Sequence, residues 1–109
     1  MKTVRIRTNQ ITDWDSFHAV FKKAMGFPSF YGTNMDAWID CMRDVYEDTG
    51  MSRILLEPGE VLALNILDSG SFRLRVPDIF DSLIRCTAFV NQYHLETIGN
   101  PGIALVFLL

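Results

Sequence analysis

The stretch FPSFYGTNMDAWIDCMRDVYED, residues 27–48, decides how the rest of the chain is organised. Its proline and its glycine are typical of a tight turn, and either Thr33 or Asn34 can cap a helix that starts directly afterwards. Asp36 follows Thr33 at the spacing of a capping box. The sequence therefore predicts a turn that leads straight into a helix.

This helix is predicted to have one apolar face and one acidic face. A rotation of about 100° per residue separates the two sets. The apolar face consists of Met35, Trp38, Cys41, Met42 and Val45, and the acidic face consists of Asp36, Asp40, Asp44 and Glu47. Aspartates four residues apart repel one another by about 0.2–0.5 kcal/mol per pair. One interpretation is that this face is only exposed to solvent and has no partner, as is usual for acidic helix faces. The repulsion, however, means that folding alone does not favour such a face.

The segment before the turn predicts a strand and a helix. Lys2–Thr8 alternates polar and apolar residues, as expected of a strand with one face outward. Thr12 or Asp13 can cap a helix that runs to about Met25. His18 has no metal-ligand spacing around it, and we expect a surface or boundary histidine without a role.

The segment after the acidic helix predicts a hairpin. Ile54–Leu56 and Val61–Leu67 are rich in strand-forming residues and are joined by a Pro-Gly turn. This predicts an added edge strand at about residues 54–60, followed by a central strand. Asp68–Arg75 reads as a polar connection with room for one helical turn.

The last third of the chain predicts a helix and a strand. Pro77 suits the first turn of a helix to about Tyr93, and Ile103–Leu109 is continuously apolar, as expected of a strand covered on both faces. Helices between successive strands indicate a parallel sheet. We therefore predict one α/β domain over residues 1–109, with three parallel strands and three to four helices.

Composition limits the function. The net charge of −3 and the pI near 5.2 argue against a nucleic-acid binder. Five acidic residues and a single cation, Arg43, lie between Asp36 and Asp48, which favours a basic protein partner. No signal peptide or membrane-spanning run is recognised, and Cys41 and Cys86 read as buried free thiols, so we expect a cytoplasmic protein.

Catalytic motifs are sparse. The sequence has no phosphate-binding loop, no nucleophile elbow and no paired His and Cys motif for zinc, so we expect neither a cofactor nor a metal. Asp36 and Asp40 could act as an acid–base or metal-binding pair, but exposed aspartates are hard to tune for that chemistry. An enzyme is the weaker hypothesis.

The turn with its FYG sequence, Asn34, Asp36 and the pair Asp40-Cys41 resembles the barstar family of small intracellular ribonuclease inhibitors. The resemblance implies that Asp40 enters the cationic pocket of a secreted or toxin ribonuclease of the barnase kind, with Asp36 on a second cation. The implied partner-binding residues are Asp40, Asp36, Phe30, Gly32, Asn34, Tyr31, Ile39 and Asp44.

The chain also departs from the family pattern. Phe30 stands where the family has a tyrosine, and Ile39 and Val45 stand where it has tryptophans, which changes the aromatic area available to a partner. Three hypotheses follow: a stoichiometric inhibitor or immunity protein, an interaction module for another basic protein, and a small enzyme. For the first we expect a free monomer and a 1:1 complex.

Overall fold

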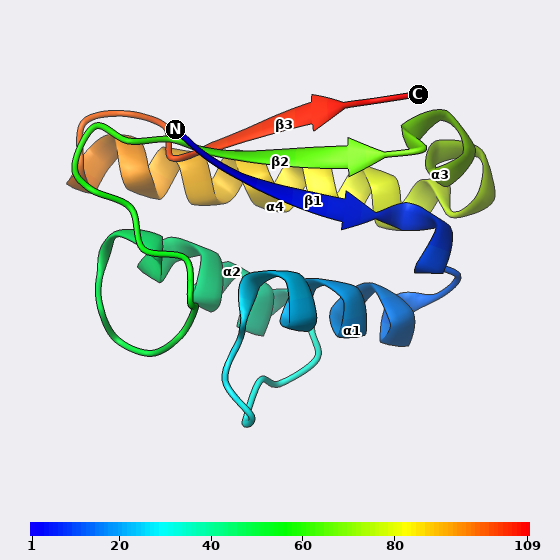
Figure 1. Cartoon of the computed structure of the whole chain (residues 1–109), viewed down its shortest axis with the longest axis horizontal. Coiled ribbons are helices and arrows are strands. Elements are labelled where there is room, and N and C mark those ends of the chain that lie inside the picture. Colours follow the sequence, from blue (N-terminus) through cyan, green and yellow to red (C-terminus); the bar gives the residue numbers. More distant parts are fainter.

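Three segments of the chain form one parallel sheet, and the helices between them pack against it (Figure 1). The structure is a computed structural model that describes residues 1–109. In chain order the elements are β1 (Lys2–Arg7), η1 (Thr8–Gln10), α1 (Trp14–Met25), α2 (Met35–Arg43), η2 (Asp44–Tyr46), β2 (Leu62–Leu67), α3 (Ser69–Arg75), α4 (Pro77–Thr97) and β3 (Ile103–Phe107). The predicted α/β fold with three parallel strands is confirmed.

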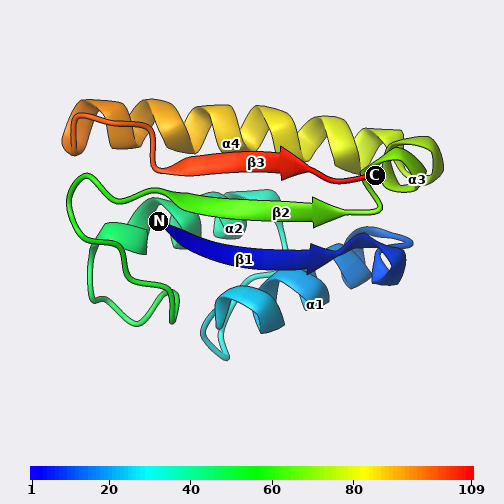
Figure 2. The same cartoon turned by 45° about the horizontal axis from the view of Figure 1, so that its top comes forward.

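The sheet has the order β1-β2-β3, with β2 in the centre. Because parallel crossovers are right-handed, two successive crossovers in this order lie on the same face. Figure 2 shows the strands in front of the helices, with no helix on the near face. The register sets Val4 beside Leu64 and Leu64 beside Leu105, and side chains of this row turn toward the helices. The next row, with Arg5 and Asn65, faces away.

This arrangement corrects the expectation for the last strand. Ile103–Leu109 was expected to be covered on both faces, but β3 is an edge strand of a sheet with one open face. Val106 is 38% exposed and Phe107 is 42% exposed. An apolar run alone does not reveal whether a second layer of helices exists, because the order of the strands decides it.

Local signals define the helix ends. The Asp13 carboxylate accepts a hydrogen bond of 2.8 Å from the Ser16 backbone at the start of α1, and Gly26 ends that helix with a φ of 66° in the left-handed region. Pro77 lies in the first turn of α4, as predicted. That helix continues to Thr97, beyond the predicted end at Tyr93, and α3 is a helix of seven residues instead of one turn.

The predicted hairpin strand at about residues 54–60 is wrong. The Pro-Gly turn forms, with Gly59 at a φ of 87°, but only the segment after it joins the sheet. Leu56 donates its backbone N–H to Val45 at 2.7 Å and buries its side chain. The segment thus follows the end of α2 and η2 instead of adding an edge strand to β1.

The core lies between the sheet and the helices. Trp38 of α2 is fully buried and packs edge-on against Phe21 of α1, with ring centroids 5.7 Å apart. On the other side, His94 of α4 donates from Nε2 to the Arg43 carbonyl at 3.1 Å, where α2 leaves its last carbonyls without helical partners. These contacts fix the orientation of α2. None of the helices combines the length and hydropathy needed to cross a bilayer.

Candidate protein-binding site

The turn before α2 is fixed by its backbone. Tyr31 donates its N–H to the Pro28 carbonyl at 3.0 Å, and Asn34 caps the helix by accepting a 2.8 Å hydrogen bond from Ala37. Asn34, one of the two predicted caps, is therefore the N-cap. The alternative capping box between Thr33 and Asp36 is wrong, because Thr33 lies outside the helix with a φ of 50°.

The acidic face divides into free and engaged carboxylates. Asp36 and Asp40 are exposed, and neither makes a hydrogen bond or an ion pair within the protein. Asp36 lies in the first turn of α2, where the helix dipole favours a negative charge. Asp44, at the C-cap, is half-buried and accepts a 2.9 Å hydrogen bond from the Thr49 hydroxyl. Asp44 thus holds the following loop, while the first two carboxylates are available to a partner.

Asp40 lies at the junction of two shallow hollows. One, of about 180 Å³, is lined on one side by Phe30, Tyr31 and Gly32 of the turn. The other, of about 270 Å³, reaches across to Tyr93 of α4. Met51 lines both hollows, so the loop after α2 borders the acidic face. A side chain from another protein that contacts Asp40 would therefore also meet an apolar rim.

The aromatic residues of the turn have opposite environments. Phe30 is 76% exposed, whereas Tyr31 is 7% exposed and its hydroxyl lies 2.6 Å from Nδ1 of His18. Burial raises the pKa of the Tyr31 hydroxyl, which keeps it protonated. The expectation for His18 is therefore wrong, because this histidine is buried and supports the turn.

The apolar positions of α2 also differ in accessibility. Trp38 is in the core, as predicted. Val45, which stands where the family has a tryptophan, is fully buried, so this position offers no exposed side chain to a partner. Ile39 is half-buried against the core and offers part of its side chain to solvent. Gly32 is exposed, which leaves its backbone open to close approach.

The free cysteines predicted from the sequence are confirmed. Cys41 is buried and Cys86 is half-buried. Burial, together with the neighbouring charges of Asp40 and Asp44, raises the pKa of the Cys41 thiol to about 11. A protonated thiol is a poor nucleophile, so Cys41 is a packing residue beneath the acidic face.

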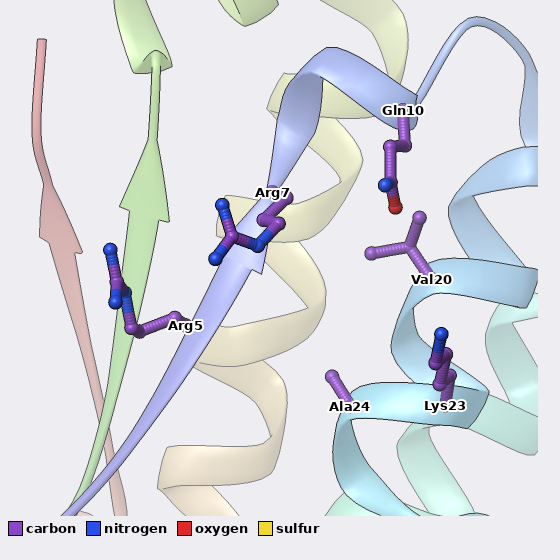
Figure 3. Close-up of a pocket in the computed structure, with 6 residues that line it drawn as sticks. All are labelled: Arg5, Arg7, Gln10, Val20, Lys23 and Ala24. Atoms are coloured by element: carbon purple, nitrogen blue, oxygen red, sulfur yellow. The ribbon is translucent and has the colours of Figure 1, made fainter.

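The largest hollow of the molecule lies elsewhere and has the opposite charge. It has a volume of about 350 Å³ and lies between β1 and α1. Figure 3 shows Arg5 and Arg7 on the strand and Lys23 on the helix around it. No acidic residue lines it, so it offers no carboxylate to a basic partner. No group of three His, Cys, Asp or Glu side chains in the structure is arranged to hold a metal ion.

Comparison with known families identifies the chain. Residues 1–106 match the family model described as Barstar (barnase inhibitor). The chain belongs to the barstar family. The match extends over the turn, the acidic helix, β1, β2 and all of β3 except its last residue. A comparison with curated proteins finds no match.

Sequence reasoning missed several residues around Asp40 in this barstar-family chain. Met51 and Tyr93 line a hollow with Asp40, although they are distant from it in the sequence or separated from it by a loop. Arg43 lines the same hollow, yet it was noted only as a lone cation. No local pattern could reveal Met51 and Tyr93, because their proximity to Asp40 depends on how the loop and α4 pack against α2. Arg43 differs, since it follows Asp40 by three residues on the same helix.

Proposed function

We propose that this protein is a stoichiometric inhibitor of a secreted or toxin ribonuclease, and that it acts as an immunity protein. Carboxylates of α2 occupy the cationic site that would otherwise hold the phosphates of RNA. The family's printed description, barnase inhibitor, supports the class of activity. The observation that carries the proposal for this chain is the free carboxylate of Asp40 at the junction of two hollows.

Asp40 is the central residue of the proposed interface. A carboxylate that enters a pocket of arginines and lysines loses water but gains charge-assisted hydrogen bonds, which are stronger than neutral ones. Asp36 lies one helical turn earlier on the same exposed face and would bind a second cation. Asp44 has a lesser role in this proposal, because it already bonds to Thr49.

The turn would supply the apolar part of the interface. Phe30 projects a mostly exposed ring beside the hollow that contains Asp40, and buried aromatic rings are frequent anchors of protein interfaces. Gly32 and Asn34 would meet the partner through their exposed atoms, and Ile39 through part of its side chain. Tyr31 would contribute by supporting the turn, because its own side chain is buried.

Charge should also steer the encounter. The chain has a net charge of −3, and its acidic residues are concentrated in residues 36–48. A basic nuclease would be attracted to this surface, and the association rate should fall as ionic strength rises. A basic partner that is not a nuclease would show the same salt dependence, so an assay of RNA cleavage is needed to separate the two functions.

The test is the inhibition of RNA cleavage by a barnase-type ribonuclease, titrated with this protein and with Asp40→Ala. We expect complete inhibition at one-to-one stoichiometry. Asp40→Ala should lose about 4–8 kcal/mol of binding free energy, the upper range for truncated hot-spot residues, of which an aspartate of the barnase–barstar pair is itself the known example.

The matched control is Asp81→Ala, which removes another exposed carboxylate, from α4 and outside both hollows. This variant should inhibit like the original protein. Equal losses in the two variants would mean that only net charge matters and would contradict the assigned role of Asp40. Absence of inhibition by the unaltered protein would leave another basic partner as the function to pursue.

A further inference from the structure

Arg43 is the only cation among the acidic residues 36–48, and its side chain is held in one place. The guanidinium carbon lies 3.9 Å from the centroid of the Tyr93 ring, which is the geometry of a cation–π contact. The backbone of Arg43 is fixed as well, because its carbonyl accepts the 3.1 Å hydrogen bond from His94. Two adjacent residues of α4 therefore position both the main chain and the side chain of Arg43.

The guanidinium is positioned but not neutralised by a partner. Arg43 shares the hollow of about 270 Å³ with Asp40 and Asp44, yet neither carboxylate approaches it closely enough to form an ion pair. The only ion pair in the structure joins the N-terminus to Glu60. Asp44 instead accepts the hydrogen bond from Thr49. The N–H groups of the Arg43 side chain make no hydrogen bond within the protein, and a guanidinium has five such donors.

A cation at this position is not expected on a surface that binds only positive charges. If the partner offered only cations, Arg43 would repel it, and an uncharged side chain would bind better. A planar guanidinium that is already ordered loses little entropy when it binds a carboxylate through two parallel hydrogen bonds. The bound surface would then contain both signs of charge, with Asp40 and Arg43 on neighbouring positions of the same hollow.

We propose that Arg43, held on Tyr93, binds a carboxylate that the partner presents beside its phosphate-binding cations. This inference rests on the proposed function and adds a specificity requirement to it. A nuclease with cations alone at its site would bind Asp40 but would leave Arg43 without a counter-charge, so the inhibitor would discriminate against it.

The alternative is that Arg43 only offsets repulsion along α2. Arg43 lies in the last turn, where a cation favours the helix dipole, and such surface effects are small. The two explanations predict opposite signs for binding. If Arg43 only relieves repulsion, then its removal makes the surface more acidic and strengthens binding to a basic nuclease. If Arg43 binds a carboxylate, its removal weakens binding.

The test measures association and dissociation rates of a barnase-type ribonuclease with the unaltered protein, Arg43→Gln and Arg43→Glu. We expect Arg43→Gln to associate slightly faster, because the surface loses a cation, but to dissociate so much faster that affinity falls at least about tenfold. Arg43→Glu should lose more affinity for the ribonuclease than Arg43→Gln. Unchanged or tighter binding of Arg43→Gln would overturn the inference.

Tyr93 provides a control for positioning. Tyr93→Phe keeps the ring that holds Arg43, and the Tyr93 hydroxyl makes no hydrogen bond in the structure, so this variant should bind more tightly than one that lacks the ring. Tyr93→Leu removes the ring beneath Arg43 and should weaken binding severalfold through faster dissociation. Equal affinity of the two variants would show that the stacked position of Arg43 is irrelevant. Thermal unfolding of each variant separates this effect from a loss of folded protein.

The two proposals fail in different ways. If the unaltered protein does not bind or inhibit the nuclease, the proposed function is wrong and the inference about Arg43 falls with it. If the unaltered protein inhibits, Asp40→Ala does not, and Arg43→Gln binds at least as tightly as the unaltered protein, only the role of Arg43 is wrong.

Discussion

Nδ1 of His18 lies 2.6 Å from the hydroxyl oxygen of Tyr31, and this buried hydrogen bond joins α1 to the turn that precedes the acidic helix. The two rings are also in contact, with centroids 5.5 Å apart. The bond adds to the backbone hydrogen bond between Tyr31 and Pro28, so the side chain and the main chain of Tyr31 are both held. The exposed ring of Phe30, one residue before Tyr31, is therefore presented from an anchored backbone.

Phe30→Ala and Tyr31→Phe should show that Phe30 contributes to nuclease binding and that Tyr31 contributes to the stability of the fold. Phe30 is mostly exposed, so its truncation should leave the free energy of unfolding within about 0.5 kcal/mol but weaken nuclease binding by more than about 1 kcal/mol. Tyr31→Phe removes the partner of His18 and should destabilise the fold by about 1–3 kcal/mol. Urea unfolding and inhibition titrations measure the two effects. The assignment is wrong if Phe30→Ala binds normally.

Acid should destabilise the protein through its two buried histidines. Burial lowers the pKa of His18 and of His94. The unfolded chain therefore binds more protons than the folded one as pH falls below the ordinary histidine range, so the free energy of unfolding decreases. Each histidine contributes a slope of at most about 1.4 kcal/mol per pH unit. We expect a lower urea midpoint at pH 5 than at pH 7.5.

His18→Gln tests this explanation, because it removes one of the two titrating groups. The variant is expected to be less stable at pH 7.5, since the bond to Tyr31 changes, but its stability should depend less on pH. A slope identical to that of the unaltered protein would exclude His18 as a source of the acid sensitivity.

The parts of the fold that local signals specify could be predicted from the sequence. Asp13 and Gly26 mark the ends of α1, and Pro77 marks the start of α4, because each acts through its own backbone. The segment Ile54–Leu56 has the residues of a strand, but its hydrogen bonds go to other partners. Strand propensity could not show this, since pairing depends on which edge the chain reaches.

The candidate site shows the same division. The turn, the cap at Asn34 and the exposure of Asp36 and Asp40 follow from a continuous stretch of sequence. The contacts of Arg43 with Tyr93 and of His18 with Tyr31 join segments that are separate in the chain. Such contacts depend on the packing of helices, and hydrophobic periodicity gives the face of a helix but not its neighbour.

Thr33 is the last residue to test, because its backbone is strained. Its φ of 50° lies in the left-handed region, which is rare for a β-branched residue and costs about 1–2 kcal/mol. Thr33→Gly should relieve this strain. Glycine also has more conformational freedom in the unfolded chain, which lowers the free energy of unfolding by about 0.5–1 kcal/mol. We therefore expect a net stabilisation of up to about 1.5 kcal/mol in urea unfolding. The matched control is Ser29→Gly in the same turn, where φ is not positive, and this change should destabilise. Equal effects of the two substitutions would show that Thr33 carries no strain. Inhibition by Thr33→Gly should be retained, since Thr33 lines neither hollow beside Asp40.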